Sequence, residues 1–244
     1  MTIAHGLCGF VAVVLLAGRL NPDARGDRVT IADLRLVAVL VTAGAVLDLL
    51  DGPVARRFGS SGMGDRLDGI CDTVTFGVAP AVVIAASGSS RSSLGYSCLI
   101  AAGGVYLVAM ILRLVRSEMT PPEVLKRGFQ GLPSAPAAGT ALGVVALNAS
   151  VAVTCLLVVL LALLVVGSFY YPRQRVSLMP LMAGGPAVGL LGICGVLPLK
   201  PAAIAMIVMV VVPSVAAAGA TWRGRRAEPG EVASPVGGGG NLEF

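Results

Sequence analysis

The sequence predicts an all-α integral membrane protein, a polytopic bundle of about eight transmembrane helices. The 244 residues are 56% hydrophobic and 13% charged, whereas soluble globular proteins carry about 25% charged residues. The apolar residues also gather in repeated runs of membrane-spanning length, and only helices and closed barrels can satisfy their backbone hydrogen bonds in lipid. Together these observations favour a helical membrane bundle over a soluble fold.

Eight apolar runs are candidates for the membrane helices. They lie at about 3–20, 34–50, 69–88, 95–115, 134–149, 150–168, 179–197 and 201–220. We expect six of them to form a core and the last pair to extend it, within one transmembrane domain at 1–222. The Gly- and Pro-rich tail, 223–244, is predicted to be disordered and cytosolic, and its final GGGGNLEF resembles an added linker.

The basic residues predict the orientation of the bundle in the cell membrane. With a cytosolic amino terminus, twelve Arg and Lys residues fall on the cytosolic side and six on the other. Basic loops at a membrane surface also explain the net charge of +5, so no nucleic-acid partner is expected. This orientation directs the aspartate-rich stretch 48–72 to the cytosol.

That stretch, DLLDGPVARRFGSSGMGDRLDGICD, places two pairs of aspartates beside long apolar runs. Asp48 and Asp51 have i, i+3 spacing at the end of the second run, and Asp68 and Asp72 have i, i+4 spacing at the start of the third. Each pair therefore lies on one face of its helix, and the short loop between them can bring both faces together. Four converging carboxylates would repel one another, which predicts bound divalent cations.

The residues around the aspartates indicate the ligand. Oxygen donors favour Mg²⁺, Mn²⁺ or Ca²⁺. The single histidine, His5, is distant in sequence; it could contact substrate, but as a lone histidine at a helix start it is expected to be structural. Gly52 permits close approach to a ligand, while Arg56 and Arg57 suit phosphate oxygens. These features point to a two-metal centre that clamps a diphosphate and activates a hydroxyl.

The stretch resembles the signature of the CDP-alcohol phosphotransferases, D-x-x-D-G-x-x-A-R followed by G-x-x-x-D-x-x-x-D. The matching residues are Asp48, Asp51, Gly52, Ala55, Arg56, Gly64, Asp68 and Asp72. Asp65 matches no fixed position and is expected to be a solvated loop residue. The resemblance implies a membrane transferase, here most similar to the bacterial and archaeal phosphatidylserine synthases.

The resemblance also implies roles. Asp48, Asp51, Asp68 and Asp72 would hold two Mg²⁺ or Mn²⁺ ions, and Asp72 would act as general base. The cytidine diphosphate would contact Asp48, Gly52, Ala55, Arg56 and Gly64. The implied reaction transfers the phosphatidyl group of CDP-diacylglycerol to the hydroxyl of L-serine with release of CMP, and the family implies a homodimer.

The subfamily likeness rests on segments in about the first 140 residues. LDGICDTVTFGVAPA (67–81), LRLVR (112–116) and FQGLPSAPAAG (129–139) resemble segments of those synthases. His5 stands where Asn is usual, Gly69 where Ser is usual, and Ser117-Glu118 where Phe-Asn is usual. These departures flank the part of the site expected to choose the acceptor, so the acceptor stays open.

Two alternatives follow. The acceptor could be inositol phosphate, glycerol 3-phosphate or another alcohol, and Arg113, Arg116, Lys126 and Arg127 are candidate contacts for it or for phosphates. As membrane anchors, these four residues would only contact lipid headgroups. A cation transporter would need acidic residues in several spans, and none lies between Asp72 and Glu118 or between Glu123 and Glu228.

Overall fold

Helices account for nearly all the regular structure of the protein. The computed structural model describes residues 2–20, 29–58, 62–88, 92–120, 128–167, 170–172, 188–189, 191–192 and 195–227. One antiparallel pair of three-residue strands, β1 (Gly128–Gln130) and β2 (Tyr170–Pro172), joins two loops. The all-α prediction is therefore right for the bundle, with this short ladder as an addition.

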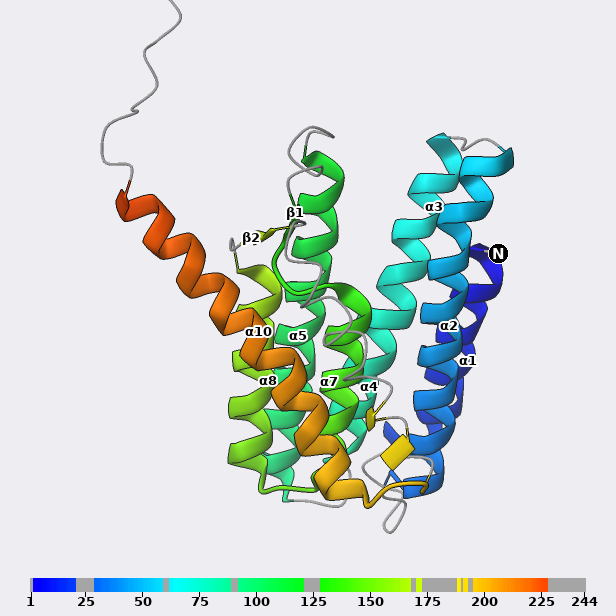
Figure 1. Ribbon diagram of the computed structural model, residues 1–244. Coiled ribbons are helices and arrows are strands. Elements are labelled where there is room, and N and C mark those ends of the chain that lie inside the picture. Colours follow the sequence, from blue (N-terminus) through cyan, green and yellow to red (C-terminus); the bar gives the residue numbers. More distant parts are fainter. Residues whose placement is uncertain are drawn as a thin grey trace, which may run out of the picture.

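The helices stand side by side, and the last one crosses the others obliquely (Figure 1). They are α1 (Thr2–Ala17), α2 (Ile31–Phe58), α3 (Gly62–Asp72), α4 (Ala79–Ala86), α5 (Ser93–Met119), α7 (Ser134–Ala146), α8 (Val151–Val166) and α10 (Leu199–Ala227). A 3₁₀ turn, η1 (Gly18–Leu20), follows α1, and a π-helix, η2 (Thr73–Val78), joins α3 to α4. α1 packs against α2 and α3, α5 against α4 and α8, and α7 against α10.

Three helical stretches within the described residues are long and apolar enough to cross a membrane. They are Arg66–Ala86, Ser93–Met119 and Leu199–Ala216, while α1, α7 and α8 are apolar but shorter. The expected count of about eight is therefore not confirmed, and the expected span 179–197 lies largely outside the described residues. The finding supports a membrane protein.

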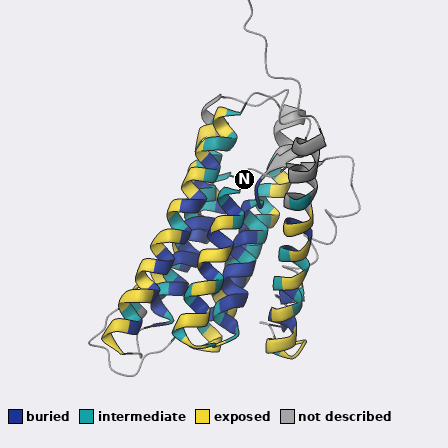
Figure 2. Cartoon of the chain, turned by 90° about the vertical axis from the view of Figure 1, so that its left-hand side faces the viewer, coloured by how far each residue is buried: buried dark blue, intermediate teal, exposed yellow. Residues whose placement is uncertain are grey.

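The outer face of the bundle is apolar, as expected for a surface against lipid. Figure 2 shows exposed residues along the outer sides of the helices and buried residues between them. Large hydrophobic side chains such as Phe10, Leu94, Leu156 and Leu163 are more than half exposed, whereas Leu16, Phe76 and Tyr106 are fully buried. Such a surface would be unusual for a soluble monomer.

Short polar side chains define where the helices begin. Before α2, Thr30 and Asp33 form a reciprocal capping box, in which the Thr30 amide donates to Asp33 Oδ2 at 2.8 Å and the Asp33 amide donates to Thr30 Oγ1 at 3.1 Å. Ser92 and Ser150 cap α5 and α8 in the simpler way, each accepting a bond from a backbone amide in the first turn. These caps satisfy amides that the helix itself cannot pair.

The π-helix η2 is held by a long-range hydrogen bond. Pro80 has no N–H to offer the carbonyl of Phe76, four residues earlier. The buried hydroxyl of Tyr106, on α5, donates to that carbonyl at 2.8 Å instead. On its other side, η2 touches α1 so closely that a Cβ on Gly9 would lie 2.5 Å from Thr75 Oγ1. α1 and α5 thus fix the segment that directly follows Asp72.

Candidate active site

Asp48 and Asp51 lie on α2, near the amino-terminal end of α1. The Thr2 hydroxyl donates to Asp51 Oδ2 at 2.9 Å, across 49 residues of sequence. Asp48 lies on the same helix, one turn earlier, and is near enough to Asp51 for their charges to interact. The i, i+3 spacing therefore places the first pair on one face, as the sequence predicts.

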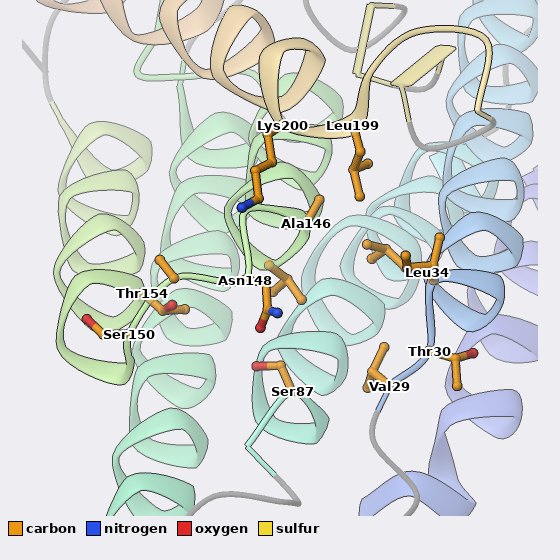
Figure 3. A pocket seen from close by; sticks show the side chains of 13 residues that line it. Val29, Thr30, Leu34, Ser87, Ala146, Asn148, Ser150, Thr154, Leu199 and Lys200 are labelled. Carbon is orange, nitrogen blue, oxygen red and sulfur yellow. The ribbon is translucent and has the colours of Figure 1, made fainter.

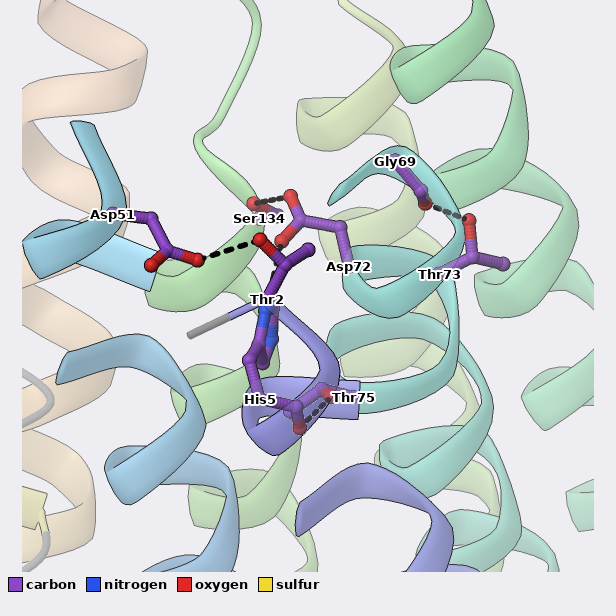
Figure 4. Close-up of polar contacts among 8 residues, drawn as sticks. All are labelled: Thr2, His5, Asp51, Gly69, Asp72, Thr73, Thr75 and Ser134. Atoms are coloured by element: carbon purple, nitrogen blue, oxygen red, sulfur yellow. Dashed lines mark hydrogen bonds and ion pairs between the residues drawn. The ribbon is translucent and has the colours of Figure 1, made fainter. Parts of the chain in front are cut away.

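Asp68 and Asp72 lie on α3, where this helix meets the π-helix. The Ser134 hydroxyl, at the start of α7, donates to Asp72 Oδ2 at 3.3 Å (Figure 4). The other oxygen, Asp72 Oδ1, is buried and has no hydrogen-bond partner among the described residues. Asp72 also interacts with the charges of Asp48 and Asp68. The four signature carboxylates therefore converge from two helices.

The site contains a residue that the sequence interpretation placed elsewhere. His5 is fully buried on α1, and its Nδ1 lies 3.9 Å from Asp72 Oδ1. One ring nitrogen of His5 and one carboxylate oxygen each from Asp48 and Asp68 lie within 4.8 Å of one another. The expectation of a site with no nearby histidine is wrong, because helix α1 inserts its first turns between α2 and α3.

The donor atoms suit a divalent cation. Carboxylate oxygens bind Mg²⁺, Ca²⁺ and Mn²⁺, and an imidazole nitrogen adds affinity for Mn²⁺, Co²⁺ or Zn²⁺. His5 has both ring nitrogens buried and without a hydrogen bond in the described part of the chain, so a ligand fits where no protein partner is present. Repulsion among Asp48, Asp68 and Asp72 would also fall on binding a cation.

Arg113 is the basic residue of α5 that lies near this cluster. Its guanidinium interacts electrostatically with Asp72 and Asp48, and its Nε is buried without a hydrogen bond to any described residue. Arg116, one turn later, instead donates from Nη1 to the Val166 carbonyl at 2.6 Å, which ties α5 to the end of α8. Of the two arginines, Arg113 is thus the one placed toward the carboxylates.

Several predicted contacts fall where the structure gives no side-chain description. Lys126 and Arg127 lie outside the described residues, and for Gly52, Ala55, Arg56 and Asp65 the structure gives the helix backbone alone. Gly64 is described and lies in α3, one turn before Asp68. The predicted contacts of these residues with the cytidine diphosphate therefore stay predictions.

The cavity of about 580 Å³ in Figure 3 is separate from the aspartates. It lies at the opposite end of the bundle, where α2, α8 and α10 begin and α4 and α7 end, and Thr30, Ser87, Asn148 and Lys200 are among its lining residues. No carboxylate of the described residues lines it. Among its described lining residues, neither the metal-binding donors nor the arginine of the aspartate cluster is present, so the cluster is the stronger candidate site.

The comparison with known families identifies the family of the chain. Residues 1–170 match the CDP-alcohol phosphatidyltransferase family, and this range contains every residue of the cluster. The chain belongs to the CDP-alcohol phosphatidyltransferase family. The predicted resemblance is thereby confirmed.

Several curated relatives carry the name CDP-diacylglycerol–serine O-phosphatidyltransferase. The chain is 38% identical to the Mycobacterium leprae protein over 115 residues, which are 45% of this chain and 37% of that protein. It is 33% identical to the Methanocaldococcus jannaschii protein over 135 residues, 55% and 62% of the two chains. For the Saccharomyces cerevisiae protein the values are 33% over 141 residues, 54% and 47%. The chain thus spans between 37% and 62% of the length of these relatives.

Three further polar residues of the site carry no signal in the aspartate signature. Thr2, His5 and Ser134 reach Asp51 and Asp72 only through the packing of α1 and α7 against the other helices. A clue was present for His5, since it stands where similar sequences carry Asn, another polar side chain. A polar residue at that position was therefore a sign that His5 belongs to the site.

Proposed function

We propose that this chain is a membrane-bound CDP-diacylglycerol–serine O-phosphatidyltransferase, a phosphatidylserine synthase of phospholipid biosynthesis. The observation that carries the proposal is the convergence of Asp48, Asp51, Asp68 and Asp72 beside Arg113. A cluster of acids at the membrane needs cations to stabilise it, and cations held by acids are suited to a diphosphate. The names of the relatives supply the substrates, CDP-diacylglycerol and L-serine.

In this proposal the four signature aspartates hold the metal centre, as Mg²⁺ or Mn²⁺. Bound ions would neutralise the diphosphate and acidify the acceptor hydroxyl. Asp72 Oδ1 accepts the hydroxyl proton, while the Ser134 hydroxyl holds Oδ2 and so orients the carboxylate. The serine oxygen then bonds to the phosphorus that carries the diacylglycerol, and the bond from that phosphorus to CMP breaks.

The other residues of the chain position the donor. Gly52, Ala55, Arg56 and Gly64 would contact the cytidine diphosphate, and Arg113 would offset the negative charge that gathers beside Asp72. The domain at 1–222 would cross the membrane several times, with its active site on the cytosolic side. Two copies of the chain would pair as a homodimer. The basic loops support the orientation, and the family resemblance supports the dimer.

A phosphorylated acceptor is the second candidate, and the charges near the site favour serine over it. Glu118, on α5, lies beside α3, so that a Cβ on Gly69 would be 2.6 Å from its Oε1. This carboxylate lies against Gly69, the residue that follows Asp68 in α3, and would repel inositol phosphate or glycerol 3-phosphate. Serine carries an ammonium group that the same carboxylate attracts.

The test is an acceptor panel with the purified protein in CDP-diacylglycerol vesicles containing Mn²⁺ or Mg²⁺. L-serine, inositol phosphate and glycerol 3-phosphate are supplied separately, and the lipid product is identified by mass spectrometry. We expect phosphatidylserine from the serine sample alone, and none after chelation. A phosphorylated lipid product would keep the family and replace the acceptor, whereas no product from any acceptor would contradict the proposal.

A further inference from the structure

His5 is a buried polar side chain whose ring forms no hydrogen bond with a described residue, and its polar contact with Asp72 Oδ1 is 3.9 Å long. Its exposed fraction is 0%. Burial of such a group without compensation costs about 1–3 kcal/mol. A bound ligand could supply the direct contact that the ring nitrogens do not make with the described residues.

Neighbouring groups hold the His5 ring in a fixed position. The Phe76 ring lies 5.0 Å from it at 40°, and the Thr75 hydroxyl donates to the His5 carbonyl at 3.1 Å. A Cβ on Gly44 would come within 2.9 Å of His5 Cδ2, so the glycine on α2 leaves the space that the ring fills. Packing of this kind fixes the orientation of the ring before any ligand binds.

The ring is directed at the carboxylates. One ring nitrogen lies within 4.8 Å of oxygens of both Asp48 and Asp68, and Nδ1 is 3.9 Å from Asp72 Oδ1. Ligand atoms about 2.1 Å from one ion lie at most about 4.2 Å apart. Three donors evenly placed around one ion at that distance lie about 3.6 Å apart, so an inward shift of at most about 0.7 Å by each side chain would bring the three donors onto a single ion.

We propose that His5 is a nitrogen ligand of the metal centre, together with Asp48 and Asp68. The inference rests on the proposed function for the presence of a metal and specifies its coordination. An imidazole nitrogen among carboxylate oxygens raises the affinity for Mn²⁺, Fe²⁺, Co²⁺ and Zn²⁺ over that for Mg²⁺ and Ca²⁺, which prefer oxygen. This centre is accordingly selective for transition metals.

The chain allows a direct spectroscopic test, because His5 is its single histidine. The full chain, purified without a histidine tag, is loaded with Mn²⁺ and examined by electron spin echo envelope modulation. Growth on ¹⁵N-labelled histidine then changes His5 alone. We expect a ¹⁴N coupling in the unlabelled protein that becomes a ¹⁵N coupling in the labelled one. Bound Mn²⁺ with no histidine coupling would overturn the inference and leave the proposed function intact, whereas a folded protein that binds no Mn²⁺ would overturn both.

Metal affinity provides the second test, with a variant that keeps an oxygen donor. In His5→Asn, the amide oxygen can still bind a hard cation. Loss of a group that only orients a metal ligand lowers affinity 10- to 100-fold, so we expect Mn²⁺ to bind at least roughly tenfold more weakly while Mg²⁺ binding changes less. Isothermal titration of each ion measures both values, with Asp33→Asn as the matched control at the far end of α2. An equal loss for Mn²⁺ and Mg²⁺ would assign His5 a packing role and overturn the inference.

Discussion

The two ends of helix α2 carry aspartates in opposite situations. At the first end, Asp33 bonds with Thr30, three residues away, and completes a helix cap. At the other end, Asp48 and Asp51 meet groups from α1, α3 and α5 that are far away in the sequence. An acid that stabilises a helix is satisfied locally, whereas the acids of the site depend on the tertiary fold and on a ligand.

The largest expected effect is on metal binding, which substitutions in the aspartate cluster should abolish and a substitution at the first end of α2 should not. Asp68→Asn combined with Asp48→Asn removes two negative charges and two oxygen donors from the cluster, so Mn²⁺ binding should fall below detection. Asp33→Asn should bind Mn²⁺ as the wild type does. Isothermal titration in the same detergent measures all three proteins. Unchanged binding in the double variant would place the metal elsewhere.

A smaller effect should follow from the hydroxyl that contacts Asp72. Ser134→Ala removes a hydrogen bond to a charged group, which contributes about 1.5–3 kcal/mol. Because this bond is long, at 3.3 Å, we expect kcat to fall by about tenfold with little change in KM for serine. Thr140→Ala, on the same helix, removes a buried hydroxyl that bonds only to the Pro136 carbonyl, and it should keep its kcat. Equal kcat values for the two variants would remove Ser134 from the site.

The smallest effect on activity is expected from a change at Tyr106, which holds the π-helix η2 in place and is not itself a predicted site residue. Tyr106→Phe removes the buried hydrogen bond to the Phe76 carbonyl, at a cost in the free energy of unfolding of about 1–3 kcal/mol. Tyr96→Phe removes a similar bond to the Leu20 carbonyl, which is only partly buried and can be hydrated, so it should cost less. Thermal unfolding in detergent compares them. A larger loss for Tyr96→Phe would contradict the proposed support of η2.

The sequence predicts those features of the site that depend on spacing within a single helix. The spacing of Asp48 with Asp51 and of Asp68 with Asp72 is a property of single helices, and the structure brings the pairs together as expected. The apolar runs likewise predict most helices, although α10 continues to Ala227 and residues 228–244 lie outside the described part. Helical periodicity carries this information without any tertiary contact.

Long-range contacts account for what the sequence interpretation missed. Thr2 reaches Asp51 across 49 residues, Ser134 reaches Asp72 across 62, and Thr75 reaches the His5 backbone across 70. No pattern along the chain reports such pairs, because they depend on which helices pack side by side. The sequence predicts a structural role for His5 because a lone histidine at a helix start usually has one, and no local pattern indicates the acids that face it.

The most direct measurement of the central claim is CMP release from CDP-diacylglycerol and L-serine in the presence of Mn²⁺, comparing Asp72→Asn with Asp33→Asn. Removal of a general base lowers rates by about 10²- to 10⁴-fold, so the first variant should lose nearly all activity while staying folded. The second should release CMP at close to the wild-type rate, because Asp33 caps the start of α2, far from the aspartate cluster. CMP release by Asp72→Asn at a rate within twofold of wild type would contradict the account.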